Sequence, residues 1–169
     1  MKGIQEKVAP IGDIEVHQSI GTLDGLGLRF GLVVARFNNQ YTDVLAQEAI
    51  RALEACGVNS KQIELVRVPG AYEVPVLIEK MAAGGKFDAL IALGLVVEGE
   101  TQHAQMIIDT TGASFLETAC RHDIPVINEI VGVHTWEQAD VRCRAGETSR
   151  GWYAGLAAVE TARVLRQVG

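Results

Sequence analysis

Chemically versatile side chains follow an apolar run in GLVVEGETQHAQMI, which extends from Gly94 to Ile107. Gly99 permits backbone conformations that other residues avoid, and free N–H groups at the start of a helix bind anions. The Thr101 hydroxyl would donate to the same anion or would cap the helix. His103 falls in the first helical turn, where the helix dipole favours a neutral imidazole that accepts protons near pH 7. The segment predicts an anion site beside a general acid or base, although His103 also fits an ordinary surface position.

Two other segments place chemically useful side chains at the ends of expected strands. Phe37, in RFNN, would stack on a planar ligand or would close the top of the core. Glu73, in PGAYE, would accept hydrogen bonds from hydroxyl or ring N–H groups, or would stabilise the start of its own helix.

Arg142, Arg144 and Arg150 form a local basic cluster. Guanidinium groups suit bidentate phosphate binding, but arginines in a loop are commonly just solvated. Cys143 lies between two of them, and their charge would lower the pKa of its thiol. The three cysteines show no spacing typical of a metal site, so we expect no metal and a reduced protein.

Strand-like and helix-like segments alternate from Leu28 onward. We expect strands over residues 28–37, 62–70, 87–97 and 124–133, and helices over 41–57, 73–85, 103–121 and 148–168, with a short helix and a loop within 135–146. In the last helix we expect an apolar stripe of Leu156, Val159, Ala162 and Leu165. Alternation of this kind predicts a parallel sheet with right-handed crossovers. The expected fold is α/β, a flavodoxin-like three-layer αβα sandwich with a four-stranded parallel sheet. Ligands bind beyond the carboxyl ends of such strands, so RFNN, PGAYE and EGETQH should converge on one edge.

The length of 169 residues suits one domain, which we place at residues 24–169. Residues 1–23 would form an N-terminal arm, either an edge strand added to a neighbouring subunit or a disordered tail. The net charge of −6, with no long basic run, argues against nucleic-acid and membrane-surface binding. No apolar run reaches the about 18 residues of a membrane span, and no signal peptide is evident, so we expect a cytoplasmic protein.

Five segments occur together in the order and at the spacing of one enzyme family. They are VVARFN, VPGAYEVP, ALGLVVEGETQH, IPVINEIVGV, and RAG followed by RGWYAGLAAVE, between about Leu28 and Leu165. In these segments the chain resembles 6,7-dimethyl-8-ribityllumazine synthase. The resemblance implies condensation of 5-amino-6-(D-ribitylamino)uracil with L-3,4-dihydroxy-2-butanone 4-phosphate, releasing phosphate and water. This reaction is the penultimate step of riboflavin synthesis and uses no cofactor.

The resemblance assigns the pyrimidine and its ribityl chain to one group of residues. Phe37 would stack on the pyrimidine, and backbone groups of Val96 and Val97 would bind its edge. The ribityl chain would lie along Ala71, Tyr72 and Glu73. Asn128 stands where many members have an aromatic residue that packs on the pyrimidine.

A second group would bind the phosphate and move protons. Backbone groups of Glu100 and Thr101, with the Thr101 hydroxyl, would bind the phosphate. Arg144 of an adjacent subunit would bind it too, and Arg150 stands where the family usually has lysine. His103 would transfer protons during imine formation, phosphate elimination and ring closure.

Sites shared between subunits imply a homo-oligomer: a pentamer, a decamer or an icosahedral capsid of 60 subunits. Riboflavin synthase is a further partner that the resemblance suggests.

Some positions depart from the family pattern. Ala104 and Gln105 replace an aromatic and an acidic residue after the histidine, and Glu98 replaces a residue that is often basic or neutral. With Asn128, these changes motivate an alternative, a weakly active paralogue that binds lumazine or flavin or forms a shell. A flavodoxin-like electron carrier is a third hypothesis, but the first strand lacks a Ser/Thr-rich phosphate loop after it.

Overall fold

The computed structural model describes residues 23–99 and 102–168. Its sheet has the strand order β2-β1-β3-β4, and every neighbouring pair is parallel. The strands are β1 (Phe30–Ala35), β2 (Ile63–Val68), β3 (Ala89–Val97) and β4 (Val126–Val133). The α-helices are α1 (Asn39–Ala55), α2 (Val74–Ala83), α3 (His103–His122), α4 (Trp136–Cys143) and α5 (Arg150–Val168), and short 3₁₀ helices are η2 (Ser60–Gln62) and η3 (Ala71–Glu73).

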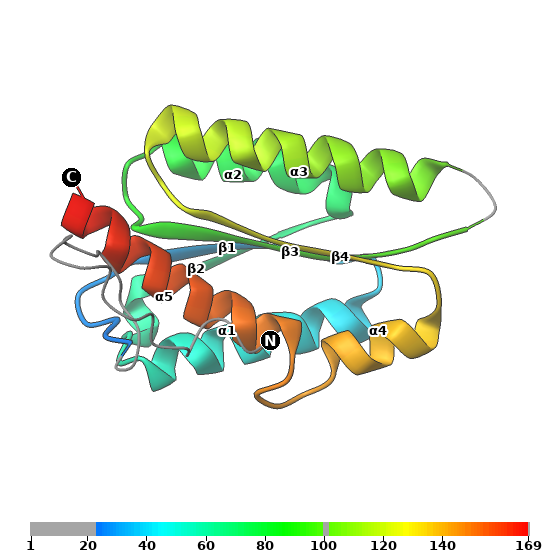
Figure 1. The fold of residues 1–169 in the computed structure, drawn as a ribbon, viewed down its shortest axis with the longest axis horizontal. Helices are drawn as coiled ribbons and strands as arrows, with labels where there is room; N and C mark the ends of the chain where they lie inside the picture. Colours follow the sequence, from blue (N-terminus) through cyan, green and yellow to red (C-terminus); the bar gives the residue numbers. More distant parts are fainter. Residues whose placement is uncertain (1–22, 100–101, 169) are drawn as a thin grey trace, which may run out of the picture.

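Helices cover both faces of the sheet, with α2 and α3 on one side and α1, α4 and α5 on the other (Figure 1). The predicted α/β class, the three layers and the four parallel strands are thereby confirmed. The predicted N-terminal arm spans residues 1–23. Apart from Leu23, it lies outside the described residues.

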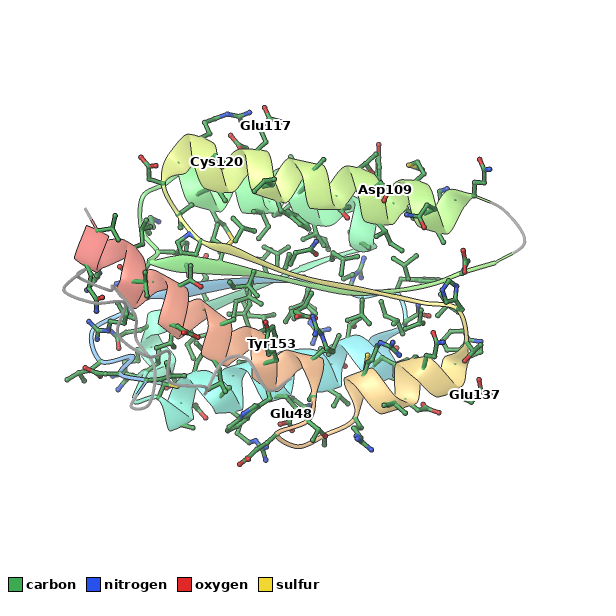
Figure 2. All side chains as sticks on the ribbon, viewed as in Figure 1. Glu48, Asp109, Glu117, Cys120, Glu137 and Tyr153 are labelled. Carbon is green, nitrogen blue, oxygen red and sulfur yellow. The ribbon has the colours of Figure 1, made fainter. Side chains whose placement is uncertain are left out.

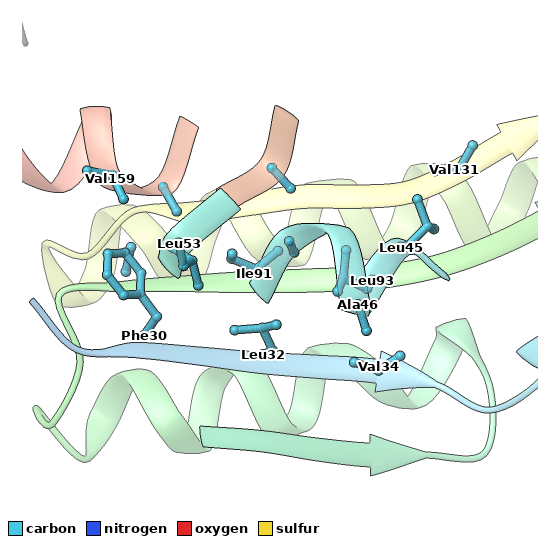
Figure 3. Packing of buried hydrophobic residues seen from close by; sticks show 14 of the residues in the cluster. Phe30, Leu32, Val34, Leu45, Ala46, Leu53, Ile91, Leu93, Val131 and Val159 are labelled. Carbon is cyan, nitrogen blue, oxygen red and sulfur yellow. The ribbon is translucent and has the colours of Figure 1, made fainter. Parts of the chain in front are cut away.

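The central strands form the core because their side chains are apolar on both faces. All six residues of β1 are buried. Phe30, Leu32 and Val34 point toward α1 and α5, where they meet Leu53 and Val159 in one apolar cluster (Figure 3). The alternate residues of β1 belong to a second cluster beneath α2 and α3. Many polar side chains lie on the outer surfaces of the helices, as Glu117 and Glu137 do in Figure 2.

Helices α2 and α3 are joined by a polar contact around Glu79. The Glu79 carboxylate accepts hydrogen bonds from Thr118 at 2.7 Å and from Arg121 at 2.9 Å, and His122 Nε2 lies 2.9 Å from it. These bonds, led by that of His122, lower the pKa of Glu79 to about 2. The contact fixes α3, whose first turn reaches the candidate site.

Helices α1 and α5 approach closely because glycines face the contact. A Cβ at Gly151 would lie 2.1 Å from the Leu45 carbonyl oxygen, and one at Gly155 would lie 2.6 Å from that of Ala49. The buried face of α5 therefore consists largely of glycine and alanine. The expected apolar stripe of α5 was wrong at Leu165, which is 41% exposed, because small residues rather than leucines make the contact.

Candidate active site

An open cavity of about 690 Å³ lies beyond the carboxyl ends of the central strands. Its lining comes from the link between β1 and α1, from η3, from the end of β3 and from the first turns of α3 and α4. A cavity of this size suits a small organic ligand. RFNN, PGAYE and the described residues of EGETQH thus converge on one cavity, as the sequence predicted. Seven of the predicted site residues line the cavity: Phe37, Ala71, Tyr72, Glu73, Val96, Val97 and His103.

Phe37 enters the cavity from the end of β1. Its backbone N–H donates to the Pro69 carbonyl at 3.0 Å, and the next residue, Asn38, has a left-handed backbone with φ of 61°. The Asn38 side-chain amide donates to the Leu95 carbonyl at 3.1 Å, which ties this turn to β3. The Phe37 side chain is 71% exposed, so the interpretation as a plug of the core is wrong. An exposed ring on a fixed turn is available to a planar ligand.

Glu73 ends the 3₁₀ helix that follows β2. Its Oε2 accepts a hydrogen bond from the Gly70 N–H at 2.8 Å, which fixes the carboxylate over its own turn. Glu73 is exposed and lines the cavity, whereas Ala71 is buried beneath it. The carboxylate therefore binds the start of its own helix and also borders the cavity, and its hydrogen bonding to a ligand stays a prediction.

The end of β3 supplies backbone rather than reactive side chains. Val96 is buried and Val97 is half-buried, and both border the cavity. The Glu98 N–H donates to the Val133 carbonyl at 2.8 Å, and the Glu98 carboxylate contacts the ring of His134. These bonds hold the end of β3 against β4. The predicted anion-binding residues Glu100 and Thr101 lie outside the described residues.

His103 is the first residue of α3, is exposed and lines the cavity, in agreement with the predicted helix start. Ala104 is buried and also borders the cavity, so the position that carries an aromatic residue in the family pattern leaves space here. The Gln105 amide donates to Asp109 at 2.8 Å, one turn further along α3. Gln105 therefore supports its helix.

Three predicted site residues lie away from the cavity of this chain. Asn128 is exposed on the face of edge strand β4 that packs against α3, and its Oδ1 accepts from the Ile130 N–H at 3.0 Å. Arg144 caps the end of α4 and is exposed. Arg150, at the start of α5, is half-buried.

Arg150 forms a bidentate ion pair with Glu129 of β4. Its Nε lies 2.9 Å from Oε2 and its Nη2 lies 2.7 Å from Oε1. The Arg150 guanidinium also lies over the Tyr153 ring, 4.9 Å from the centroid. Burial raises the pKa of Glu129 to about 7, and Arg150 opposes that rise. The Arg150 guanidinium is thus already paired with Glu129 in this chain. The phosphate contact expected of Arg150 stays a prediction.

Cys143 is buried at the end of α4, which contradicts the idea of an activated thiol. Burial raises its pKa to about 12, the Glu129 charge adds to this rise, and Arg142 opposes it more weakly. The neighbouring arginines do not dominate because the thiol points into the core while Arg142 and Arg144 are exposed.

Trp136 is a lining residue that the sequence reasoning missed. It begins α4, is 48% exposed and borders the cavity. The segment TWEQADVRC suggested only a short helix and a loop. A tryptophan directly after the capping Thr135, beyond the end of a buried strand, was the available signal.

The described parts of the chain show no cluster of three or more metal-ligating side chains. Within residues 23–99 and 102–168, no helix is long and apolar enough to cross a membrane.

Comparison with known proteins identifies the family. A model of the family 6,7-dimethyl-8-ribityllumazine synthase matches residues 27–166. The protein of that name from Paraburkholderia phytofirmans is 40% identical over 159 residues, which cover 92% of each chain. Its namesake from Cupriavidus pinatubonensis is 43% identical over 143 residues, covering 85% of this chain and 83% of the relative. The chain belongs to the 6,7-dimethyl-8-ribityllumazine synthase family.

Proposed function

We propose that this enzyme condenses 5-amino-6-(D-ribitylamino)uracil with L-3,4-dihydroxy-2-butanone 4-phosphate to form 6,7-dimethyl-8-ribityllumazine, releasing phosphate and water. One observation carries the proposal: in a member of this family, a single cavity gathers Phe37, Glu73 and His103 with the end of β3. A pure scaffold has no need for these groups in one place.

The cavity suits the pyrimidine substrate. The exposed Phe37 ring would stack on the pyrimidine, and backbone groups of Val96 and Val97 would bind the edge of that ring. Residues Ala71 to Glu73 would hold the ribityl chain. Because Gly70 engages one Glu73 oxygen, Oε2, the other would accept bonds from ribityl hydroxyls.

Proton transfer would fall to His103 at the start of α3. Imine formation, phosphate elimination and ring closure each move a proton, and one imidazole beside the bound reactants serves all three. Much of the acceleration would come from holding the two substrates together. Phosphate departure needs anion stabilisation, which we assign to Glu100, Thr101 and the start of α3.

The remaining phosphate ligand would come from an adjacent subunit. Arg144 lies outside the cavity of its own chain, as expected of a residue that serves a neighbour. We infer a homo-oligomer built from pentamers, either alone, as decamers or as a capsid of 60 subunits. Asn128 would likewise act at this shared boundary, residues 1–23 would form an arm of the 24–169 domain, and riboflavin synthase would be an additional partner.

The decisive experiment mixes the purified protein with both substrates and follows lumazine absorbance and fluorescence against the enzyme-free reaction. We expect the wild type to exceed that baseline clearly. His103→Ala should lower the rate modestly, because substrate proximity remains. Arg144→Ala should lower it strongly by raising KM for the butanone phosphate.

Three parallel variants sharpen the assignment of the phosphate ligand. Arg142→Ala and Arg150→Ala test the other arginines of the cluster, and Lys80→Ala on the exposed side of α2 controls for loss of a remote positive charge. A larger loss in Arg142→Ala than in Arg144→Ala would move the phosphate site to Arg142. A wild type that binds the pyrimidine but reacts at the baseline rate would refute the synthase and favour a binding paralogue.

A further inference from the structure

Trp136 has no part in the proposed reaction, yet it borders the same cavity as Phe37 and His103. An indole that is 48% exposed leaves apolar surface in water that another contact would cover. Its place, at the first residue of α4 directly beyond the edge strand β4, brings it to the carboxyl edge of the sheet. The residue is therefore a candidate ligand contact.

Contacts with α1 hold the indole in place. The Tyr41 ring stacks on Trp136 with centroids 5.8 Å apart and planes inclined by 21°. The Tyr41 hydroxyl donates to Asp140 at 2.7 Å, one turn along α4 from Trp136, and this bond is the main cause of the raised pKa of Tyr41. Thr135 caps the helix start through the Gln138 N–H at 3.4 Å. The Tyr41 ring is thus held by α1 and the Trp136 ring by α4.

Stacking on Tyr41 covers one face of the indole, and the half-exposed residue also borders the cavity. A rigid aromatic surface loses little conformational entropy when a flat ring stacks on it. Phe37, two residues before the start of α1, and Trp136, which packs on the first turn of α1, both border the cavity near that helix end. Of the three exposed aromatic residues that line the cavity, Phe37, Tyr72 and Trp136, the first and the last thus lie close to the start of α1.

We propose that Trp136 is a specificity-determining residue that contacts the flat heteroaromatic ring of the ligand, with Tyr41 and Asp140 as positioning residues. This inference rests on the proposed function, because the ring in question is the pyrimidine of the substrate. The contact raises affinity for the ring and takes no part in proton transfer.

Fluorescence tests the contact directly, because the chain has only two tryptophans. In a Trp152→Phe background Trp136 is the sole tryptophan. The introduced phenylalanine keeps an aromatic ring beneath Arg51, whose guanidinium lies 4.8 Å from the Trp152 centroid. Titration with 5-amino-6-(D-ribitylamino)uracil should change Trp136 emission with saturation. Free tryptophan at the same absorbance corrects for light taken up by the pyrimidine.

Kinetics then separate affinity from chemistry. Trp136→Ala should raise KM for the pyrimidine about fivefold or more while kcat changes less than twofold. Trp136→Phe should restore most of the affinity, whereas Trp152→Phe should behave as the wild type. Normal catalysis with unchanged Trp136 emission at saturating pyrimidine, or a Trp136→Ala KM within twofold of wild type, would overturn this inference alone. A protein at the baseline rate whose emission still responds would instead overturn only the proposed reaction.

Discussion

Glu129 shows how burial and pairing compete at a single carboxyl group. The side chain is 3% exposed and receives two hydrogen bonds from Arg150. Burial penalises the charged form and raises the pKa of Glu129 to about 7 despite that partner. Below about pH 7 the native carboxyl therefore keeps a proton that the unfolded chain releases near the ordinary pKa of 4.5, and the pair with Arg150 is fully ionic only above that pH.

From this difference we predict that stability falls as pH rises from about 4.5 to about 7. Between these values the native state binds more protons than the unfolded state, so the free energy of unfolding decreases with pH. The loss should be on the order of 2 kcal/mol. Denaturant unfolding at pH 5 and at pH 8, at one fixed protein concentration, measures it.

Glu129→Gln is the matched variant for this measurement. The amide keeps the shape and one hydrogen bond to Arg150 but does not titrate, so the difference between the two pH values should shrink. A difference as large in Glu129→Gln as in wild type would assign the pH dependence to other groups. The thiol of Cys143 is not a competing source, since its pKa of about 12 lies outside this range.

The position of a side chain at the cavity was predictable where its residue type and its place at the end of a strand together pointed there. Phe37, Glu73 and His103 follow predicted strands or begin a predicted helix, and all three line the cavity. Trp136 and Glu129 were not predictable in this way. The stack of Trp136 on Tyr41 and the pair of Glu129 with Arg150 join residues far apart in the sequence, and only the folded chain brings them together.

At the scale of elements, the contact between α1 and α5 depends on glycine. A methyl group at Gly155 would lie 2.6 Å from the Ala49 carbonyl oxygen and 2.7 Å from the Ala52 side chain, so the helices would have to separate. Gly112 of α3 offers the opposite case. There an added Cβ would lie 3.6 Å from its nearest neighbour, the Asn128 amide nitrogen, which is ordinary van der Waals distance.

We predict that Gly155→Ala lowers stability by about 1–3 kcal/mol through overpacking. Gly112→Ala should raise it by up to about 1 kcal/mol, because alanine favours the helix and meets no obstacle. Thermal unfolding of the two variants beside wild type measures both effects. If both variants changed the unfolding temperature equally and in the same direction, helix propensity rather than the α1–α5 contact would determine the effect of alanine at these glycines.

Apolar periodicity predicted the bounds of the strands and helices well. It predicted less well which residues of a helix are buried. The predicted strand over 87–97 is β3 at Ala89–Val97, and the predicted helix from His103 ends one residue later than expected, at His122. Hydrophobicity alone placed Leu165 of α5 in the core, whereas close packing on α1 selects Gly151, Ala154 and Gly155. A prediction based on large apolar side chains does not identify a helix contact that is made by glycine and alanine.

At the scale of the whole molecule, parallel strands bring their carboxyl ends to one edge, and this topology assembles the cavity. The sequence pattern sufficed to predict that edge because strands and helices alternate without interruption. It did not place the arginines, since Arg144 and Arg150 follow the last strand through α4 and its connection. In the folded chain Arg144 lies outside the cavity, so its proposed phosphate contact would require a second subunit.

A shared site predicts that two inactive variants complement each other. One chain carries Phe37→Ala with His103→Ala and lacks a working cavity, and the other carries Arg144→Ala and lacks the donated arginine. In a ring formed from equal amounts of both, each cavity and the arginine it receives come from different chains. About a quarter of the sites would then combine an intact cavity with an intact arginine, by random pairing around a closed ring.

Co-expression of the two variants, followed by the lumazine assay on the purified mixed oligomer, makes this measurable. Activity near a quarter of wild type, against traces in each variant alone, would support donation between subunits. If each site were built within one chain, no chain in the mixture would hold both intact halves, and activity would stay at the average of the two variants. Mixing the finished oligomers without subunit exchange is the control, because pre-formed rings cannot complement.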